Sequence, residues 1–244
     1  MVNLIYGINT VLHAIDAKQV RFVYLQKEKK SPELLNLFAT NKISFKIVER
    51  QVLNKLANNE NHQGIVAEVI GYSTLKLEEL LNKVKDHQKS ILLMLDGIED
   101  PHNLGAILRV ADAFGVDGVI FKNSHQVGLN ATVAKVSTGA INYVDCVSVA
   151  NLSSAIKILK ENGYWIYASD ASAKDSYSMI KYSDKCCLIV GSEGFGISRL
   201  VKENSDVLLK IPMCGHVNSL NASTAAAILV SEVYVKGMWR QKKI

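Results

Sequence analysis

The stretch SILLMLDGIEDPHNLGAILR, residues 90–109, decides the fold of this 244-residue chain. It begins with a continuous apolar run, Ile91 to Leu95, which is typical of a strand buried on both faces of a parallel sheet. Small and polar residues follow, and an apolar helical pattern then extends from Leu104 to Phe114. A buried strand that leads through a short loop into a helix is the repeating unit of open α/β sheets.

The same alternation continues toward the end of the chain. Further strands are predicted at 118–121, 143–147, 164–168, 187–190 and 207–211. Helices are predicted at 130–139, 152–161 and 222–235. The expected fold class is therefore α/β, with a parallel sheet and helices on both of its faces.

Residues 1–71 form a smaller α/β pattern of their own. Its predicted strands are 21–25, 44–48 and 64–70, and its predicted helices are 9–17, 51–57 and one that starts at Pro32 with Ser31 as N-cap. A Lys- and Glu-rich connector follows, with a short helix at 77–84. We predict an N-terminal domain at 1–71, a linker at 72–89 and a C-terminal domain at 90–244.

Composition and cysteine spacing exclude several protein classes. Hydrophobic residues make up 48% of the chain and charged residues 21%, which is typical of globular proteins. No apolar run is long enough to span a membrane, and the N-terminus does not resemble a secretory signal. No cysteine pair has zinc-ligand spacing, so we expect no metal site and buried free thiols in a reducing cytoplasm; the cysteines are Cys146, Cys186, Cys187 and Cys214.

The net charge of +5 is unevenly distributed. Residues 1–89 hold 13 Lys and Arg against 9 Asp and Glu, a balance of +4, whereas residues 90–244 hold 15 against 14. If the protein has a polyanionic partner, the first third is the better candidate for its docking surface. A solvated basic face explains the same balance equally well.

Three segments join a predicted buried strand to a helix through small and polar residues: 95–109, 188–197 and 211–223. In open α/β sheets, ligands bind at the carboxyl ends of the strands, where all three segments lie. The glycines do not form a dinucleotide-binding fingerprint, and there is no Walker A sequence. Clustered glycines let backbone amides approach a ligand closely, but taken alone they favour tight turns.

Together, the three segments resemble the motifs of the SpoU (TrmH-like) class of RNA ribose methyltransferases, within the SPOUT superfamily. The first motif is matched by Asn103 with Arg109, the second by Gly191-Ser192-Glu193-Gly194 and the third by Ser219-Leu220-Asn221. This resemblance covers about residues 90–240. Residues 1–71 resemble the small ribosomal-protein-like substrate-binding domain that precedes the catalytic domain in bacterial 23S rRNA methyltransferases.

The resemblance implies a SPOUT parallel sheet with a deep trefoil knot and a homodimer. It also implies S-adenosyl-L-methionine as cofactor and a guanosine ribose 2′-hydroxyl of 23S rRNA, not DNA, as the acceptor. The main chain of Gly191, Ile211 and Leu220 would bind the cofactor. The catalytic residues that it implies are Asn103, Arg109, Glu193, Ser219 and Asn221.

Several of these side chains suit more than one role. In the family, the arginine matching Arg109 is proposed as a general base, but a protonated guanidinium is better suited to hold a phosphate or stabilise an alkoxide. Glu193 would fix Asn221 or Arg109, and Asn221 is also placed to cap the last helix. Asn103 belongs to a turn that itself suits a helix N-cap. Two histidines, His102 and His216, are weaker candidates because neither has a visible partner.

Three other functions are weighed against this one. The nearest is the same chemistry on tRNA, and another is a non-catalytic RNA-binding factor in ribosome assembly. The intact set of Asn103, Arg109, Glu193 and Asn221 favours an enzyme. A Rossmann-type enzyme acting on a small molecule lacks its glycine fingerprint.

Overall fold

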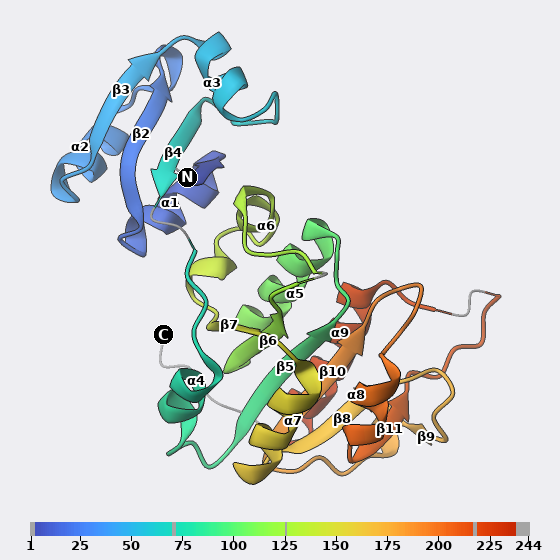
Figure 1. The fold of residues 1–244 in the computed structure, drawn as a ribbon. Helices are drawn as coiled ribbons and strands as arrows, with labels where there is room; N and C mark the ends of the chain where they lie inside the picture. Colours follow the sequence, from blue (N-terminus) through green and yellow to red (C-terminus); the bar gives the residue numbers. More distant parts are fainter. Residues whose placement is uncertain (1–2, 70–71, 125, 217–218, 238–244) are drawn as a thin grey trace. The chain divides into compact units, whose positions relative to one another are not determined.

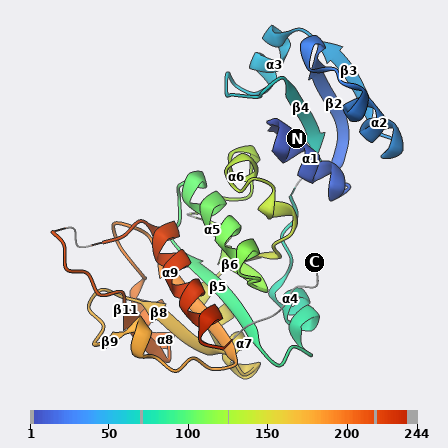
Figure 2. The ribbon, with the colours of Figure 1, turned by 180° about the vertical axis from the view of Figure 1, so that it is seen from behind.

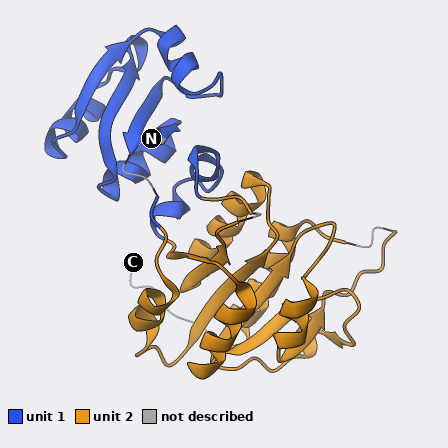
Figure 3. Cartoon of the chain, viewed as in Figure 1, with its two compact units in different colours: residues 1–73, 129–143 blue, residues 74–128, 144–244 orange. Residues whose placement is uncertain are grey.

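The computed structural model describes residues 3–69, 72–124, 126–216 and 219–237. The chain divides into two compact units (Figure 3). One contains residues 1–73 and 129–143, and the other contains residues 74–128 and 144–244. Residues 129–143 were expected in the C-terminal domain, but they group with the first unit because helix α6 (Ala131–Val136) packs against its first strand.

The first unit is built on a four-stranded sheet with the order β1-β4-β2-β3. β2 and β3 pair in parallel, whereas β4 pairs antiparallel with both β1 and β2. The strands are β1 (Asn3–Tyr6), β2 (Val20–Gln26), β3 (Ser44–Val48) and β4 (Ile65–Val69). Besides α6, its helices are α1 (Ile8–Asp16), α2 (Pro32–Thr40) and α3 (Arg50–Leu56).

The start of α2 shows how the sequence fixes an element of this unit. Ser31 Oγ accepts the backbone N–H of Leu34 at 3.3 Å, and Pro32 is the first helical residue, as predicted. Phe38 on the same helix is fully buried. The sequence did not predict β1, which is only four residues long.

The second unit contains a seven-stranded, wholly parallel sheet with the order β7-β6-β5-β10-β8-β11-β9. Every residue of β5 (Ser90–Asp96) is buried, as expected for a strand covered on both faces. The other strands are β6 (Gly118–Lys122), β7 (Cys146–Val149), β8 (Trp165–Ser169), β9 (Asp175–Ser176), β10 (Lys185–Gly191) and β11 (Val207–Lys210). The predicted α/β fold class is confirmed.

Helices cover both faces of this sheet (Figures 1 and 2). On one face, α4 (Leu77–Val84), α7 (Leu152–Glu161) and α8 (Arg199–Asn204) contribute to an apolar core with the sheet. On the other face, α5 (Pro101–Ala113) and α9 (Ala222–Val235) pack against each other. Within the described ranges, no helix is long and apolar enough to cross a membrane.

Several expectations need correction. Helix α5 begins at Pro101 rather than Leu104, because Asp100 Oδ1 accepts the backbone N–H of His102 at 2.8 Å and caps the helix. Asn103 therefore lies inside the first turn and is not the cap. Cys214 is exposed, whereas the other three thiols are buried. The trefoil knot stays a prediction.

Candidate active site

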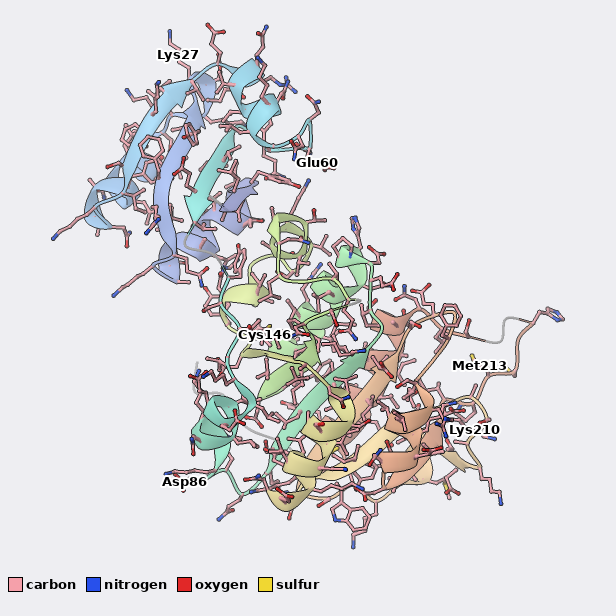
Figure 4. The ribbon with its side chains drawn as sticks, viewed as in Figure 1. Lys27, Glu60, Asp86, Cys146, Lys210 and Met213 are labelled. Carbon is pink, nitrogen blue, oxygen red and sulfur yellow. The ribbon has the colours of Figure 1, made fainter. Side chains whose placement is uncertain are left out.

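Three segments of the second unit converge at one edge of its sheet. The first follows β5, the second follows β10, and the third runs from the end of β11 to the start of α9 (Figure 1). Lys210 and Met213, labelled in Figure 4, mark the beginning of this third segment. Parallel strands place their carboxyl ends at the same edge, so residues far apart in sequence meet there.

A hydrogen-bonded cluster of Asn103, Glu193 and Asn221 joins the three segments. Asn103 Nδ2 donates to Glu193 Oε1 at 2.9 Å. Asn221 Nδ2 donates to the same carboxylate oxygen at 2.6 Å and to Asn103 Oδ1 at 2.8 Å. The sequence predicted either Asn221 or Arg109 as the partner of Glu193, and the structure shows Asn221. The second Glu193 oxygen makes no bond within the part of the chain that the structure describes, so it can accept one from a ligand.

Asn221 has a second contact that fixes the orientation of its amide. Its Oδ1 accepts the backbone N–H groups of Ser223 at 2.9 Å and Thr224 at 3.3 Å, so Asn221 is the N-cap of α9, as predicted. With the oxygen directed toward the helix, the Nδ2 group must face Glu193. The start of α9 and the polar cluster are therefore coupled through one side chain.

Glycines hold the loop that carries Glu193 in a tight turn. Ser192 and Gly196 exchange two backbone hydrogen bonds, with N–O distances of 3.2 and 2.9 Å. Gly196 has φ +64°, a conformation that favours glycine. A Cβ atom on Gly191 would lie 2.2 Å from the carbonyl of Gly196, so no other residue fits there without moving the backbone.

A cavity of about 340 Å³ opens beside the cluster. Its lining includes Gly191, Ile211 and Leu220, the three residues expected to bind a cofactor, together with Ser219 and Glu193. The cavity has the size of small-molecule sites, which run from about 300 to 1,000 Å³. The structure thus brings these five residues together.

Sequence reasoning missed an ion pair in this cavity, between a buried carboxylate and a partly exposed lysine. Asp170 follows β8 directly, and its carboxylate contacts Lys202 Nζ through one oxygen. The other oxygen accepts the backbone N–H and the hydroxyl of Ser172, at 2.8 and 2.5 Å. Burial acts to raise the pKa of Asp170, but the bonds from Lys202 and Ser172 outweigh it and the pKa is lowered. Its place after a predicted strand end was the signal that could have identified it.

Arg109 is not part of the cluster. Its side chain is exposed on α5, and within the described residues it makes no hydrogen bond or ion pair. Arg109 lies six positions after Asn103. In a helix this spacing corresponds to a rise of about 9 Å and a rotation of about 240°. His102 and His216 are exposed as well, and among the residues that the structure describes neither imidazole has a hydrogen-bond partner.

Two family models match the chain. The model of the SpoU rRNA methylase family matches residues 90–231. A model described as RNA 2′-O ribose methyltransferase substrate binding matches residues 4–75. The two matches do not overlap, and together they cover residues 4–75 and 90–231.

Curated relatives are similar over most of the chain. A protein of Staphylococcus saprophyticus named as a TrmH family tRNA/rRNA methyltransferase is 45% identical over 205 residues, which is 84% of this chain and 82% of that protein. A protein of Staphylococcus haemolyticus with the same name is 41% identical over 237 residues, or 96% of this chain and 95% of that one.

Solved structures share the fold. The SpoU methyltransferase AviRb of Streptomyces viridochromogenes, in complex with AdoMet, has a TM-score of 0.82 at 21% identity and covers 96% of this chain and 89% of its own. A crystal structure titled as an RNA 2′-O ribose methyltransferase has a TM-score of 0.78 at 24% identity, covering 97% and 89%.

Proposed function

Since this chain belongs to the SpoU rRNA methylase family, we propose that it methylates the ribose 2′-hydroxyl of a guanosine in 23S rRNA. The cofactor of this family is S-adenosyl-L-methionine. The observation that carries the proposal is the Asn103–Glu193–Asn221 cluster beside the cavity formed by Gly191, Ile211 and Leu220.

The cavity fits this cofactor in size and chemistry. The close approach of Gly191 to the backbone of Gly196 leaves main-chain groups, rather than side chains, facing the cavity at that point. Ile211 and Leu220 add apolar walls suited to an adenine ring. When bound, the cofactor supplies a methyl group carried on a sulfonium cation.

The chain's own residues would then orient the acceptor ribose. A free hydroxyl is a poor nucleophile, so its developing negative charge must be stabilised or its proton removed. Asn103 and Asn221 hold Glu193 at a fixed position. The other carboxylate oxygen of Glu193 can accept a hydrogen bond from a ribose hydroxyl. Much of the catalytic effect would come from this orientation, because two reactants held in line avoid a large entropic cost.

We assign Arg109 the role of binding an RNA phosphate and stabilising the nascent alkoxide. A guanidinium remains protonated at physiological pH and offers five hydrogen-bond donors. It is therefore better suited to bind an anion than to remove a proton. The separation of Arg109 from the cluster along α5 supports a site completed by the Arg109 of a second subunit.

Helix α9 supports the homodimer that this site requires. Apolar side chains occur all around the helix, and Val235 is 64% exposed. A helix that is apolar on every side is normally buried on every side. Pairing of two subunits through α5 and α9 would cover the remaining surface.

The first unit would dock the RNA. Residues 4–75 match a substrate-binding model, and residues 1–73 hold 9 Lys and Arg against 6 Asp and Glu, a balance that suits a phosphate backbone. Methylation of tRNA is the second candidate, supported by the tRNA/rRNA names of the relatives.

Methyl transfer by the purified protein tests the proposal. The full chain is incubated with labelled S-adenosyl-L-methionine and either unmodified 23S rRNA or unmodified tRNA, and the nucleosides are analysed by mass spectrometry. We expect 2′-O-methylguanosine from 23S rRNA, and its loss in Glu193→Gln. Label in tRNA alone would favour the second candidate. No label in either RNA would refute the proposed methyltransferase activity.

A further inference from the structure

Phe195 is the most exposed large apolar side chain among the described residues. It is 96% exposed at the tip of the turn that carries Glu193. Single exposed apolar residues are common on protein surfaces, so exposure alone indicates nothing. Phe195 differs from them in two ways: hydrogen bonds hold its backbone in a closed turn, and it lines two cavities.

The turn fixes the backbone that carries this ring. The two hydrogen bonds between Ser192 and Gly196 close the turn, and the Phe195 N–H donates to Ser192 Oγ at 3.4 Å. On its inner side, Gly191 packs directly against Gly196. Because the backbone is already held, ligand binding would cost the conformational entropy of the ring alone and not that of the loop.

Phe195 is among the lining residues of two cavities. One is the cavity assigned to the cofactor, and the other has a volume of about 260 Å³. The second cavity is lined by the loop from Gly97 to Asp100 and also by Asn103, Glu193 and Ala222. Glu193 of the polar cluster therefore lines both cavities. With the cofactor in the first cavity, the second is the space left for the base of a ribose held at the cluster.

The charge of the second cavity indicates which part of an RNA enters it. Glu99 and Asp100 are exposed carboxylates in its lining, and they repel phosphate groups. Carboxylates accept hydrogen bonds, and unstacked RNA bases are read on their hydrogen-bonding edges. Guanine is the base whose Watson–Crick edge offers two adjacent donors, N1–H and the 2-amino group.

We propose that this second cavity binds the base of the target nucleotide, with Phe195 as its stacking surface and Glu99 facing its donor edge. The proposal rests on the proposed function, because that function places the target ribose at the cluster. It adds a base-binding site and a specificity residue that the shared motifs do not include.

Variants of Phe195 test the stacking surface. Base–aromatic stacking contributes about 1–3 kcal/mol per base, so Phe195→Ala should lower kcat/KM for RNA by about 5- to 150-fold. Phe195→Tyr keeps the ring and should stay within about threefold of the wild type. Trp165→Ala is the matched control, because Trp165 is a 52% exposed aromatic residue at the opposite, amino edge of the sheet.

Binding measurements separate the base site from a cofactor effect. Because Phe195 also lines the cofactor cavity, RNA binding of Phe195→Ala is measured with S-adenosylhomocysteine at saturation, and thermal stability should be unchanged. RNA with an abasic target nucleotide should bind the wild type more weakly than intact RNA, but the two should bind Phe195→Ala equally. If Phe195→Ala discriminated against abasic RNA as strongly as the wild type does, the proposal would be overturned.

A modified base tests the role of Glu99. Inosine lacks the 2-amino group of guanosine, so an inosine target should react about tenfold more slowly with the wild type, as one hydrogen bond to a charged acceptor predicts. In Glu99→Gln this difference should shrink to about threefold or less. Methylation of inosine and guanosine targets at equal rates by the wild type would refute the donor-edge assignment, whereas an enzyme that methylates no RNA would refute the proposed function instead.

Discussion

Asn221 has two separable tasks, and substitutions at this position can test each one. Its Oδ1 caps α9, while its Nδ2 donates to Glu193 and Asn103. Asn221→Ala removes both functions. Asn221→Ser keeps a capping oxygen but loses the Nδ2 donors, and Asn221→Asp keeps the cap while placing a second carboxylate beside Glu193.

The expected magnitudes follow from these contacts. Loss of an N-cap costs about 1 kcal/mol, which lowers the melting temperature of a chain of this size by about 2–4 °C. Loss of the donor to the Glu193 carboxylate costs about 1.5 kcal/mol at this exposed site, which corresponds to about tenfold in kcat. Asn221→Ala should show both losses, and Asn221→Ser should show chiefly the second. Asn221→Asp should be the least active, because the two carboxylates repel each other.

The assay combines thermal unfolding with single-turnover methyl transfer. Asn151→Ala is the matched control, because Asn151 Oδ1 caps α7 through the N–H of Ser154 at 3.0 Å, away from the cluster. This variant should lose stability like Asn221→Ala but keep its activity. If Asn221→Ser and Asn221→Asp both turn over at the wild-type rate, the cluster has no role in the reaction and the reasoning is refuted.

Three other predictions concern the cavity and the pH dependence of stability. Gly191→Ala should abolish binding of S-adenosylhomocysteine in calorimetry, since its Cβ would lie 2.2 Å from the carbonyl of Gly196; unchanged affinity would exclude this backbone from the cofactor site. Lys202→Met should destabilise the protein by about 1–3 kcal/mol at pH 7, because Asp170 loses its cation. The pKa of Asp170 is lowered in the fold, so this difference should shrink as the pH falls below about 4 in urea titrations, and a constant difference would contradict the pairing. Burial lowers the pKa of His62, so the fold should lose stability as the pH falls below about 6.5, and a His62→Gln variant with the same slope would contradict this assignment.

The sequence predicted the parts of the molecule that local patterns determine. β5, with its continuous apolar run, and α9, with Asn221 as cap, occur where they were expected. The Ser31–Pro32 start of α2 does as well. In each case the residues that define the element are neighbours in the chain, so the pattern and its physical cause coincide.

The parts that the sequence did not predict depend on tertiary contacts. Residues 129–143 join the first unit through packing on β1, which no local pattern encodes. The Asp170–Lys202 pair joins residues 32 positions apart, and its role depends on a cavity that exists only in the fold. The three motifs were visible, but the hydrogen bonds that connect Asn103, Glu193 and Asn221 were not.

The position of the methyl group in cellular RNA tests the central claim most directly. Ribose methylation is mapped across total RNA from a strain that lacks this protein, and from the same strain carrying either the wild-type chain or Glu193→Gln. Our account predicts that one guanosine of 23S rRNA loses its 2′-O-methyl group in the deletion strain. The wild-type chain should restore that group, and Glu193→Gln should not. An unchanged rRNA map, or restoration by Glu193→Gln, would contradict the account.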